Sequence, residues 1–420
     1  MKIKNILLSF ALLFNLTTTT IAAEEVPASL QHLPTKEVVE PWQGKEGEIR
    51  LRSFGDFLIH DRVSWMADRS SWLYQGAVEQ LEAEGIWNNG TVIGAEEVPN
   101  IIEGSQDYDF LPMVARMAPY TSYADVTVAN MEIIAAYPDL PISGYPQFNA
   151  PGSVLEAMKA IGVDLVSNTT NHTLDWFAEG AISSINNLDT VGIMYSGSYK
   201  DMDDFQTPRI IDKNGIKLGF LSYTYGTNGI PVPEGQGYLV SLLDLEVILS
   251  EVEWLKPQVD AVVVTLHMGP EYGEWPDEQQ EYYFQALSDA GVKLILGGHP
   301  HVLQPMAWFN EDETFAIYSQ ASFLTGQREL ENKQGGITEV TFKRGDDGEV
   351  FVTDPKFMPT FVLGIEAEKM YETVPLADYE AFAVPEGAWR WDYLADHMAG
   401  LTDNFEFVGH LETAWTEQSE

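Results

Sequence analysis

Short apolar runs of strand length alternate with segments whose apolar residues recur at helical spacing over most of the chain. Several runs are apolar throughout, which is typical of strands covered on both faces. This alternation predicts an α/β fold with buried sheets. Strands are expected at 49–54, 124–130, 162–166, 191–196, 217–225, 259–266 and 292–296, and a strand and turn at 314–323. Helices are expected at 111–120, 154–161, 178–188, 242–255 and 279–290.

Turn residues add local detail to this pattern. Residues 209–217 are expected to form a hairpin, because Asn214-Gly215 is a strong turn signal. Residues 337–342 and 350–357 are expected to form a late antiparallel pair across a glycine-containing turn. Residues 64–106 contain several tryptophans and are expected either to line a cleft or to pack in the core.

The first 23 residues differ from the rest of the chain. Lys2 and Lys4 precede the apolar stretch 6–16, and small residues follow at 20–23. This order is typical of a secretory signal peptide, and the apolar stretch is too short for a comfortable membrane span. We therefore expect an exported protein, periplasmic or extracellular, with no transmembrane segment after signal removal. An uncleaved anchor is the alternative.

The remaining chain divides into four parts by composition and by its pattern of apolar residues. A polar lead-in covers 24–47, and strand–helix alternation characterises the principal domain at 48–327. Late antiparallel strands are expected at 328–360, and an acidic and aromatic, helical C-terminal appendage at 361–420.

The chain is strongly acidic and lacks cysteine. It carries 64 Asp and Glu residues against 23 Lys and Arg residues, for a formal net charge of −41. Such a surface repels nucleic acid and anionic lipid, so nucleic acid is not expected among its partners. Because no disulfide can form, the fold must rest on a large core. An anionic substrate would need local positive charge, which bound divalent metals supply.

Two histidines directly follow one of the apolar runs. The stretch Gly297–Pro305, GGHPHVLQP, comes after the strand expected at 292–296. His299 and His301 are two residues apart, so on an extended backbone they face the same side at a separation of roughly 7 Å. The glycines permit a close backbone approach, and Pro300 stops the strand. The pattern indicates either two imidazoles aimed at a metal centre or a surface turn.

Other polar residues also follow expected strands. Asn171, His172 and Asp175 lie in one loop after a strand, and His267 stands at the end of another. In α/β folds the carboxyl ends of strands gather the functional groups. We therefore expect one site to contain Asp56, Glu132, Asn171, His267, His299 and His301, with His60 near a further strand end.

Six short motifs occur in order along the chain. They are Gly55-Asp56, Asn130-Met131-Glu132, Asn171-His172 with Asp175, His267-Met268-Gly269 with Glu271-Tyr272, His299-Pro300-His301, and Tyr318-Ser319. Together they resemble the CapA family of capsule-synthesis or poly-γ-glutamate biosynthesis proteins, within the calcineurin-like metallophosphatase superfamily. The resemblance implies a metallophosphatase-like two-sheet α/β/β/α sandwich carrying two divalent metals about 3.5–4 Å apart.

The resemblance also implies a role for each residue by its position. His172 would be the general acid, and Asp175 would orient it as a catalytic partner. The metal ligands would be Asp56 and His301 on the first metal, Glu132 as the bridge, and Asn171, His267 and His299 on the second metal. The mixed oxygen and nitrogen set suits manganese, iron or zinc.

One position departs from the superfamily's first motif, which is Asp-x-His. Leu58 stands where the histidine is expected, so either His60 supplies that ligand or the first metal site lacks one.

Three functions remain open from the sequence. In the first, the chain is a metal-dependent hydrolase of a phosphoester or of an amide in a γ-glutamyl polymer, and its substrate is an anionic polymer or a phosphoester. Alternatively, it is a non-catalytic polymer-binding, export or assembly component that works with other capsule synthesis and export proteins. In the third, the protein binds one structural metal that stabilises the loops and has no catalytic role.

Overall fold

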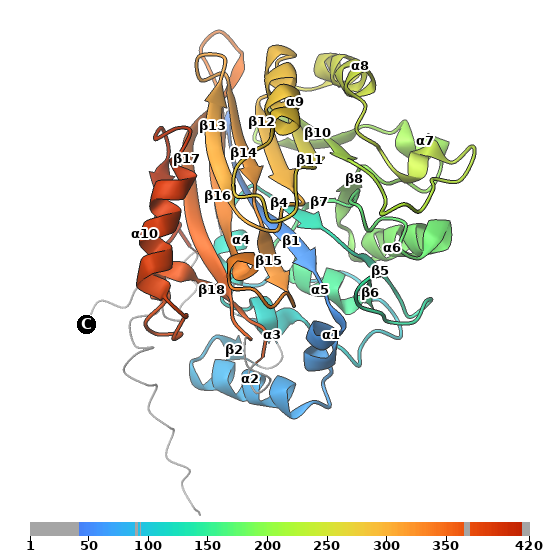
Figure 1. The fold of residues 1–420 in the computed structure, drawn as a ribbon, viewed down its shortest axis with the longest axis vertical. Coiled ribbons are helices and arrows are strands. Elements are labelled where there is room, and N and C mark those ends of the chain that lie inside the picture. Colours follow the sequence, from blue (N-terminus) through green and yellow to red (C-terminus); the bar gives the residue numbers. More distant parts are fainter. Residues whose placement is uncertain (1–41, 89–90, 93, 365–369, 414–420) are drawn as a thin grey trace, which may run out of the picture.

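The computed structural model describes residues 42–88, 91–92, 94–364 and 370–413. The expected signal peptide at 1–23 and most of the lead-in at 24–47 therefore lie outside the described residues. Figure 1 shows the described chain as two packed sheets with helices on the outer faces.

The larger sheet has nine strands, in the order β18-β17-β16-β1-β4-β7-β8, with β15 paired to β1 and β19 paired to β17. The strands β1, β4, β7 and β8 are mutually parallel, so their carboxyl ends lie at one edge. The bounds are β1 Glu48–Leu58, β4 Val126–Met131, β7 Leu165–Ser167, β8 Met194–Ser196, β15 Ser322–Thr325, β16 Gln334–Arg344, β17 Val350–Val362, β18 Thr373–Pro375 and β19 Glu406–Phe407.

The smaller sheet has six strands, in the order β13-β14-β12-β11-β10-β9. The bounds are β9 Arg209–Lys213, β10 Ile216–Thr224, β11 Ala261–His267, β12 Leu294–Gly298, β13 Gln304–Phe309 and β14 Thr314–Ser319. The strands β9 and β10 form the expected hairpin. Asn214 and Gly215 have φ values of 52° and 76°, as a two-residue turn of this kind requires.

The core is layered because the strand residues alternate between faces. On β1, Leu51 packs between the two sheets, whereas Phe54 packs outward beneath the helices. On the smaller sheet, Leu296 faces the inter-sheet core and Ile295 faces helices. Helices and sheets therefore stack as α/β/β/α, and the expected two-sheet sandwich is confirmed.

The helices cover both outer faces and one edge (Figure 1). Those beside the larger sheet are α1 Asp61–Ala67, α2 Trp72–Ala83, α3 Leu111–Val114, α4 Ala118–Thr121, α5 Ser153–Ala160 and α6 Phe177–Val191. Those beside the smaller sheet are α8 Leu245–Leu255 and α9 Glu278–Asp289, and α10 Gly387–Met398 lies along β13. The short α7 Met202–Phe205 and the pairs β2 Trp87–Asn88 with β3 Thr91–Val92 and β5 Ile134–Tyr137 with β6 Asn149–Pro151 complete the α-helices and β-strands of the described residues.

One expectation about local structure was wrong, and two strands were not expected. The helix expected at 111–120 is split into α3 and α4, each of which starts at a proline in its first turn. The strand and turn expected at 314–323 are present as β14 and the turn at Ala321, whose φ is 52°, but the strand β15 that follows in the larger sheet was not expected. The strand β13 was not expected because it contains Pro305, but β13 is an edge strand, where proline is tolerated.

The last part of the chain is joined to the principal sheet. The segment 328–360 supplies β16 and β17, and β16 pairs directly with β1. The segment 361–420 contains α10 but also β18 and β19, which extend the same sheet. No helix in the part of the chain that the structure describes is long and apolar enough to cross a membrane.

Candidate metal centre

The expected ligands meet at the carboxyl ends of strands from both sheets. Asp56 on β1 lies opposite Asn130 on β4, and His267 on β11 lies opposite Gly298 on β12. Because these neighbours are parallel, their ends reach the same edge of each sheet. The face-to-face packing of the two sheets then brings the six expected ligands, Asp56, Glu132, Asn171, His267, His299 and His301, into one region.

A first cluster contains Asp56, Glu132 and His301. One ligand atom from each lies within 4.8 Å of the others, and all three side chains are buried. The Nδ1 atom of His301 is 3.1 Å from Asp56 Oδ2 and 3.5 Å from Glu132 Oε2. These three residues fit the expected first metal position.

A second cluster contains Glu132, His267 and His299, again within 4.8 Å. The Nε2 atom of His267 is 3.3 Å from Glu132 Oε1 and 2.8 Å from Asn171 Oδ1. The two oxygens of Glu132 therefore face two different histidines. Glu132 therefore lies between the two clusters and belongs to both.

The state of the buried groups fits divalent cations. Glu132 is fully buried, and neither of its oxygens accepts a hydrogen bond within the described chain. Burial and the nearby Asp56 charge raise the pKa of Glu132 well above its ordinary value. Burying a charged carboxylate without hydrogen-bond donors lowers the stability of the fold, and a cation between the clusters would neutralise that charge.

The histidines are held in the form that binds metal. Burial lowers the pKa of His267 well below its ordinary value and lowers the pKa of His299 to about 3. Both rings are therefore neutral at ordinary pH, and a neutral imidazole nitrogen is a ligand. The Nδ1 atom of His299 is buried and has no hydrogen-bond partner among the described residues.

The backbone around the two histidines is specialised, as the glycines predicted. A Cβ atom on Gly297 would lie 1.9 Å from Tyr318 O, so only glycine lets β12 pass β14 here. His299 and His301 have φ values of 97° and 59°. Positive φ is rare for residues other than glycine and is typical of functional sites. The strained turn aims both rings at the same region.

The departure at Leu58 leaves the first cluster with three protein ligands. His60, the residue that could replace the missing histidine, lies in none of the described three-ligand clusters. Its Nδ1 atom is 3.1 Å from Leu58 O, and its ring packs edge-on against Phe148 at 5.1 Å. Burial lowers the pKa of His60 to about 4. His60 is therefore a neutral, buried neighbour of the site.

His172 and Asp175 form a pair beside the clusters. The Nδ1 atom of His172 is 2.7 Å from Asp175 Oδ2, which also accepts from Phe148 N at 2.7 Å. The His172 ring stands edge-on to Phe148 at 4.8 Å. Asn228 Nδ2 lies 3.5 Å from the same ring nitrogen and its Oδ1 accepts from Asn171. His172 is thus fixed next to Asn171, whose Oδ1 lies 2.8 Å from His267 of the second cluster.

A cavity of about 440 Å³ opens beside the clusters. His172, His301 and Asn171 line it together with Glu271, whose side chain is exposed. Glu271 forms a third cluster with His299 and His301 within 4.8 Å. Glu271 was not predicted as a ligand, although its position four residues after His267 was the available signal.

The comparisons with known proteins agree with the motifs. Residues 50–327 match the family model described as "Bacterial capsule synthesis protein PGA_cap". The "PGA biosynthesis protein CapA" of Bacillus subtilis (strain 168) is 28% identical over 207 residues, which cover 47% of this chain and 52% of that protein. The "Capsule biosynthesis protein CapA" of Bacillus anthracis is 25% identical over 263 residues, or 60% of this chain and 62% of that protein. The chain thus spans about half to three fifths of the length of these curated relatives.

Solved structures give more distant matches. The 5′-nucleotidase precursor from Thermus thermophilus is 13% identical, with a TM-score of 0.37, and the match covers 83% of this chain and 59% of that one. The NAD nucleotidase of Haemophilus influenzae is 9% identical, with a TM-score of 0.36, and the match covers 88% and 66% of the two chains.

Proposed function

The chain belongs to the bacterial capsule synthesis family PGA_cap, and we propose that it is an exported, metal-dependent hydrolase in capsule or poly-γ-glutamate biosynthesis. The observation that carries the proposal is the position of Glu132 between two buried ligand clusters, beside the His172–Asp175 pair and a cavity. A chain that only binds polymer has no need for these groups at the ends of so many strands.

The ligand set supports two divalent cations, of manganese, iron or zinc. Asp56 and His301 would hold one, Asn171, His267 and His299 the other, and Glu132 both. Cations held there would lower the pKa of water and polarise the bond under attack. Mixed carboxylate, amide and imidazole ligands suit these metals better than calcium.

The chain's own groups supply positioning and a proton. Since Nδ1 of His172 is bound to Asp175, Nε2 is the nitrogen left for a substrate in the cavity. His172 would donate its Nε2 proton to the leaving group, as a general acid does. Asp175 would keep the ring in that orientation and stabilise its protonated form.

The substrate and setting are inferred from the family and the chain's chemistry. An anionic polymer such as poly-γ-glutamate, or a phosphoester, would bring negative charge to clustered cations on an otherwise repulsive, acidic protein. The N-terminal sequence supports export, and capsule synthesis or export proteins are the partners that this setting implies.

The experiment measures metal content and hydrolysis on the same preparation. Protein purified without chelator should contain two metal ions per chain and hydrolyse bis(p-nitrophenyl) phosphate or poly-γ-glutamate. A preparation that contains metal but is equally inactive on both as wild type and as His172→Ala would instead favour a polymer-binding or assembly role.

A further inference from the structure

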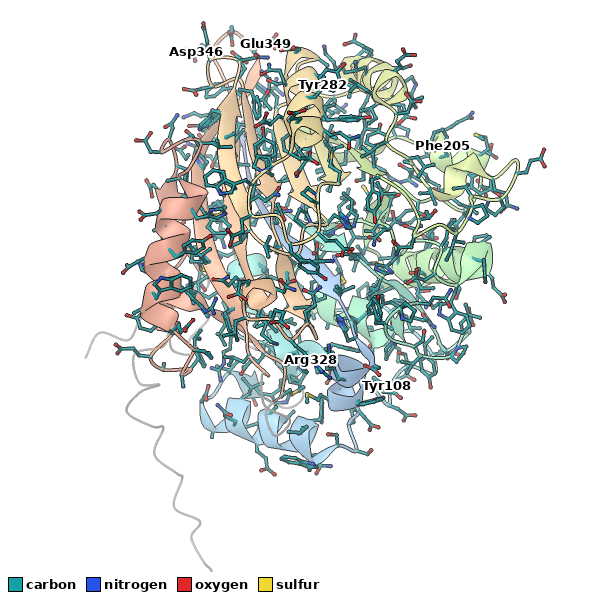
Figure 2. The ribbon with its side chains drawn as sticks, in the orientation of Figure 1. Tyr108, Phe205, Tyr282, Arg328, Asp346 and Glu349 are labelled. Carbon is teal, nitrogen blue, oxygen red and sulfur yellow. The ribbon has the colours of Figure 1, made fainter. Side chains whose placement is uncertain are left out.

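A second and larger cavity adjoins the one at the metal clusters. It has a volume of about 660 Å³ and shares three lining residues, Arg62, Gln327 and Arg328, with the 440 Å³ cavity. The two cavities are therefore neighbours with part of their lining in common. Figure 2 shows Arg328 beside α1, which carries Arg62.

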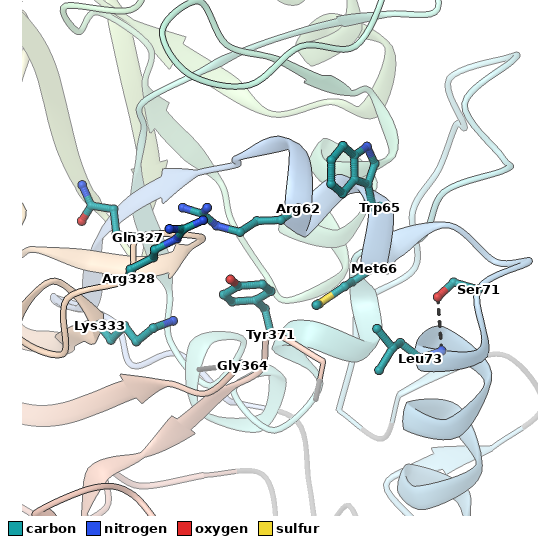
Figure 3. Close-up of a pocket in the computed structure, with 10 residues that line it drawn as sticks. All are labelled: Arg62, Trp65, Met66, Ser71, Leu73, Gln327, Arg328, Lys333, Gly364 and Tyr371. Carbon is teal, nitrogen blue, oxygen red and sulfur yellow. Dashed lines mark hydrogen bonds between the residues drawn. The ribbon is translucent and has the colours of Figure 1, made fainter. Parts of the chain in front are cut away.

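One wall of this second cavity is cationic. Figure 3 shows the side chains of Arg62 and Arg328 side by side, with Lys333 and Tyr371 below them. Within the described chain, none of these three cations has a carboxylate oxygen within 4.0 Å, although acidic residues outnumber basic ones 64 to 23. Three unneutralised cations in a chain of net charge −41 create a local region that attracts anions.

Lys333 is the most informative member of this wall. Lys333 is 1% exposed, yet among the described residues its ammonium contacts only the Tyr371 ring, 4.6 Å from the centroid, and Leu363 O at 3.5 Å. Burial and the charge of Arg62 lower the pKa of Lys333 to about 8. An ammonium buried without an anion destabilises the fold. Packing alone therefore does not account for it, whereas a bound anion does.

The opposite wall is apolar. Trp65, Met66 and Leu73 line it, and Trp65 is 65% exposed despite its size. Figure 3 shows Trp65 and Met66 across the cavity from the cations. A ligand that matches both walls has an anionic group attached to a hydrocarbon segment.

We propose that this cavity, lined by Arg62, Arg328, Lys333 and Trp65, is a subsite that binds a second anionic group of the substrate, a carboxylate or a phosphate on a short hydrocarbon stem. The assignment to the substrate rests on the proposed function, because it places the reacting bond at the metal clusters and the second anion in the neighbouring cavity. The anion site itself stands on Lys333 and its neighbours alone.

The test is titration calorimetry with three probes: glutarate, its neutral counterpart glutaramide, and inorganic phosphate. Wild type should bind glutarate or phosphate and not glutaramide, and the preferred anion identifies the class of the group. Lys333→Met and the exposed Arg328→Gln should each weaken binding by about tenfold. Lys256→Met is the matched control, since this exposed lysine directly follows α8, lines neither cavity and pairs with Glu253.

Glu132→Gln separates this inference from the proposed function. That variant removes the bridge of the metal clusters, so a subsite that depends only on the cationic wall should still bind the anion. Retained binding in Glu132→Gln together with loss in Lys333→Met supports the subsite even if the protein hydrolyses nothing. The inference is overturned if wild type binds neither anion, or if both wall variants bind like Lys256→Met.

Discussion

The Nδ1 atom of His172 lies 2.7 Å from Oδ2 of Asp175, three residues along the same loop. The same carboxylate oxygen accepts from the backbone N–H of Phe148, so Asp175 is fixed from two sides. Both side chains are buried, and His172 lines the cavity beside the metal clusters. The arrangement fixes one face of the imidazole and leaves the other for a ligand.

His172→Ala should abolish hydrolysis without removing metal. Loss of a general acid typically lowers the rate by roughly 10²–10⁴-fold. Because His172 is in no described ligand cluster, the metal content should equal that of wild type. Hydrolysis of bis(p-nitrophenyl) phosphate and elemental analysis of the same samples check both halves. Equal activity in variant and wild type would remove His172 from the reaction.

Asp175→Asn tests the orienting role separately. The amide keeps the size of the side chain but loses the negative charge, so we expect a smaller loss of about 10–100-fold. A variant with full loss of folding, seen by circular dichroism, would show instead that the Phe148 contact is structural.

The bridging geometry of Glu132 predicts a graded loss of metal. Glu132→Gln should reduce both ions, because its oxygens face His267 and His301 at 3.3 and 3.5 Å. Asp56→Asn should chiefly reduce the first ion, and His299→Ala the second. Elemental analysis after purification without chelator gives the stoichiometry. Two ions retained in Glu132→Gln would contradict the bridge.

The metal clusters could be predicted because their signals are local. Each ligand follows an apolar run, and parallel strands bring such positions to one edge. His299 and His301 carried a further signal in Gly297 and Gly298, which the close contact with Tyr318 explains. The alternation of strands and helices predicted the α/β class with covered sheets, whereas the two-sheet architecture was implied by the resemblance to the family.

The cationic wall could not be predicted in the same way. Arg62 follows β1 by four residues, whereas Arg328 and Lys333 lie more than 260 positions later, beyond β15. No periodic pattern connects them, since they meet only because β15 pairs with β1. The strand β13 could not be predicted either, because Pro305 has no N–H and argues against a strand with neighbours on both sides. Only the structure shows that β13 is an edge strand with a single neighbour.

Gly297→Ala should destabilise the fold. The added Cβ would lie 1.9 Å from Tyr318 O and 2.5 Å from Tyr318 C, both backbone atoms that cannot rotate away. Separating β12 from β14 to accommodate it should cost about 1–3 kcal/mol or more. Urea unfolding measures the change. Gly76→Ala is the control, because its Cβ meets nothing within 4 Å on the helix α2, so it should stabilise by about 0.5–1 kcal/mol.

Lys333→Met should stabilise the chain in a pH-dependent way. The ordinary lysine pKa is 10.5, and burial lowers the pKa of Lys333 in the folded chain to about 8. Between these values the unfolded chain binds the proton and the folded chain does not, so in wild type this residue makes stability rise with pH. Below pH 8 the full cost of the buried charge remains, and methionine removes it.

We therefore expect Lys333→Met to exceed wild type by about 1–3 kcal/mol near neutral pH, with the advantage shrinking towards roughly pH 10. Urea unfolding at both pH values measures the difference, and Lys256→Met should show no such trend because its side chain is exposed and paired with Glu253. An anion at saturating concentration should narrow the gap at neutral pH, since it stabilises only wild type. A difference that stays constant across this range would mean that the ammonium is already neutralised in the folded chain.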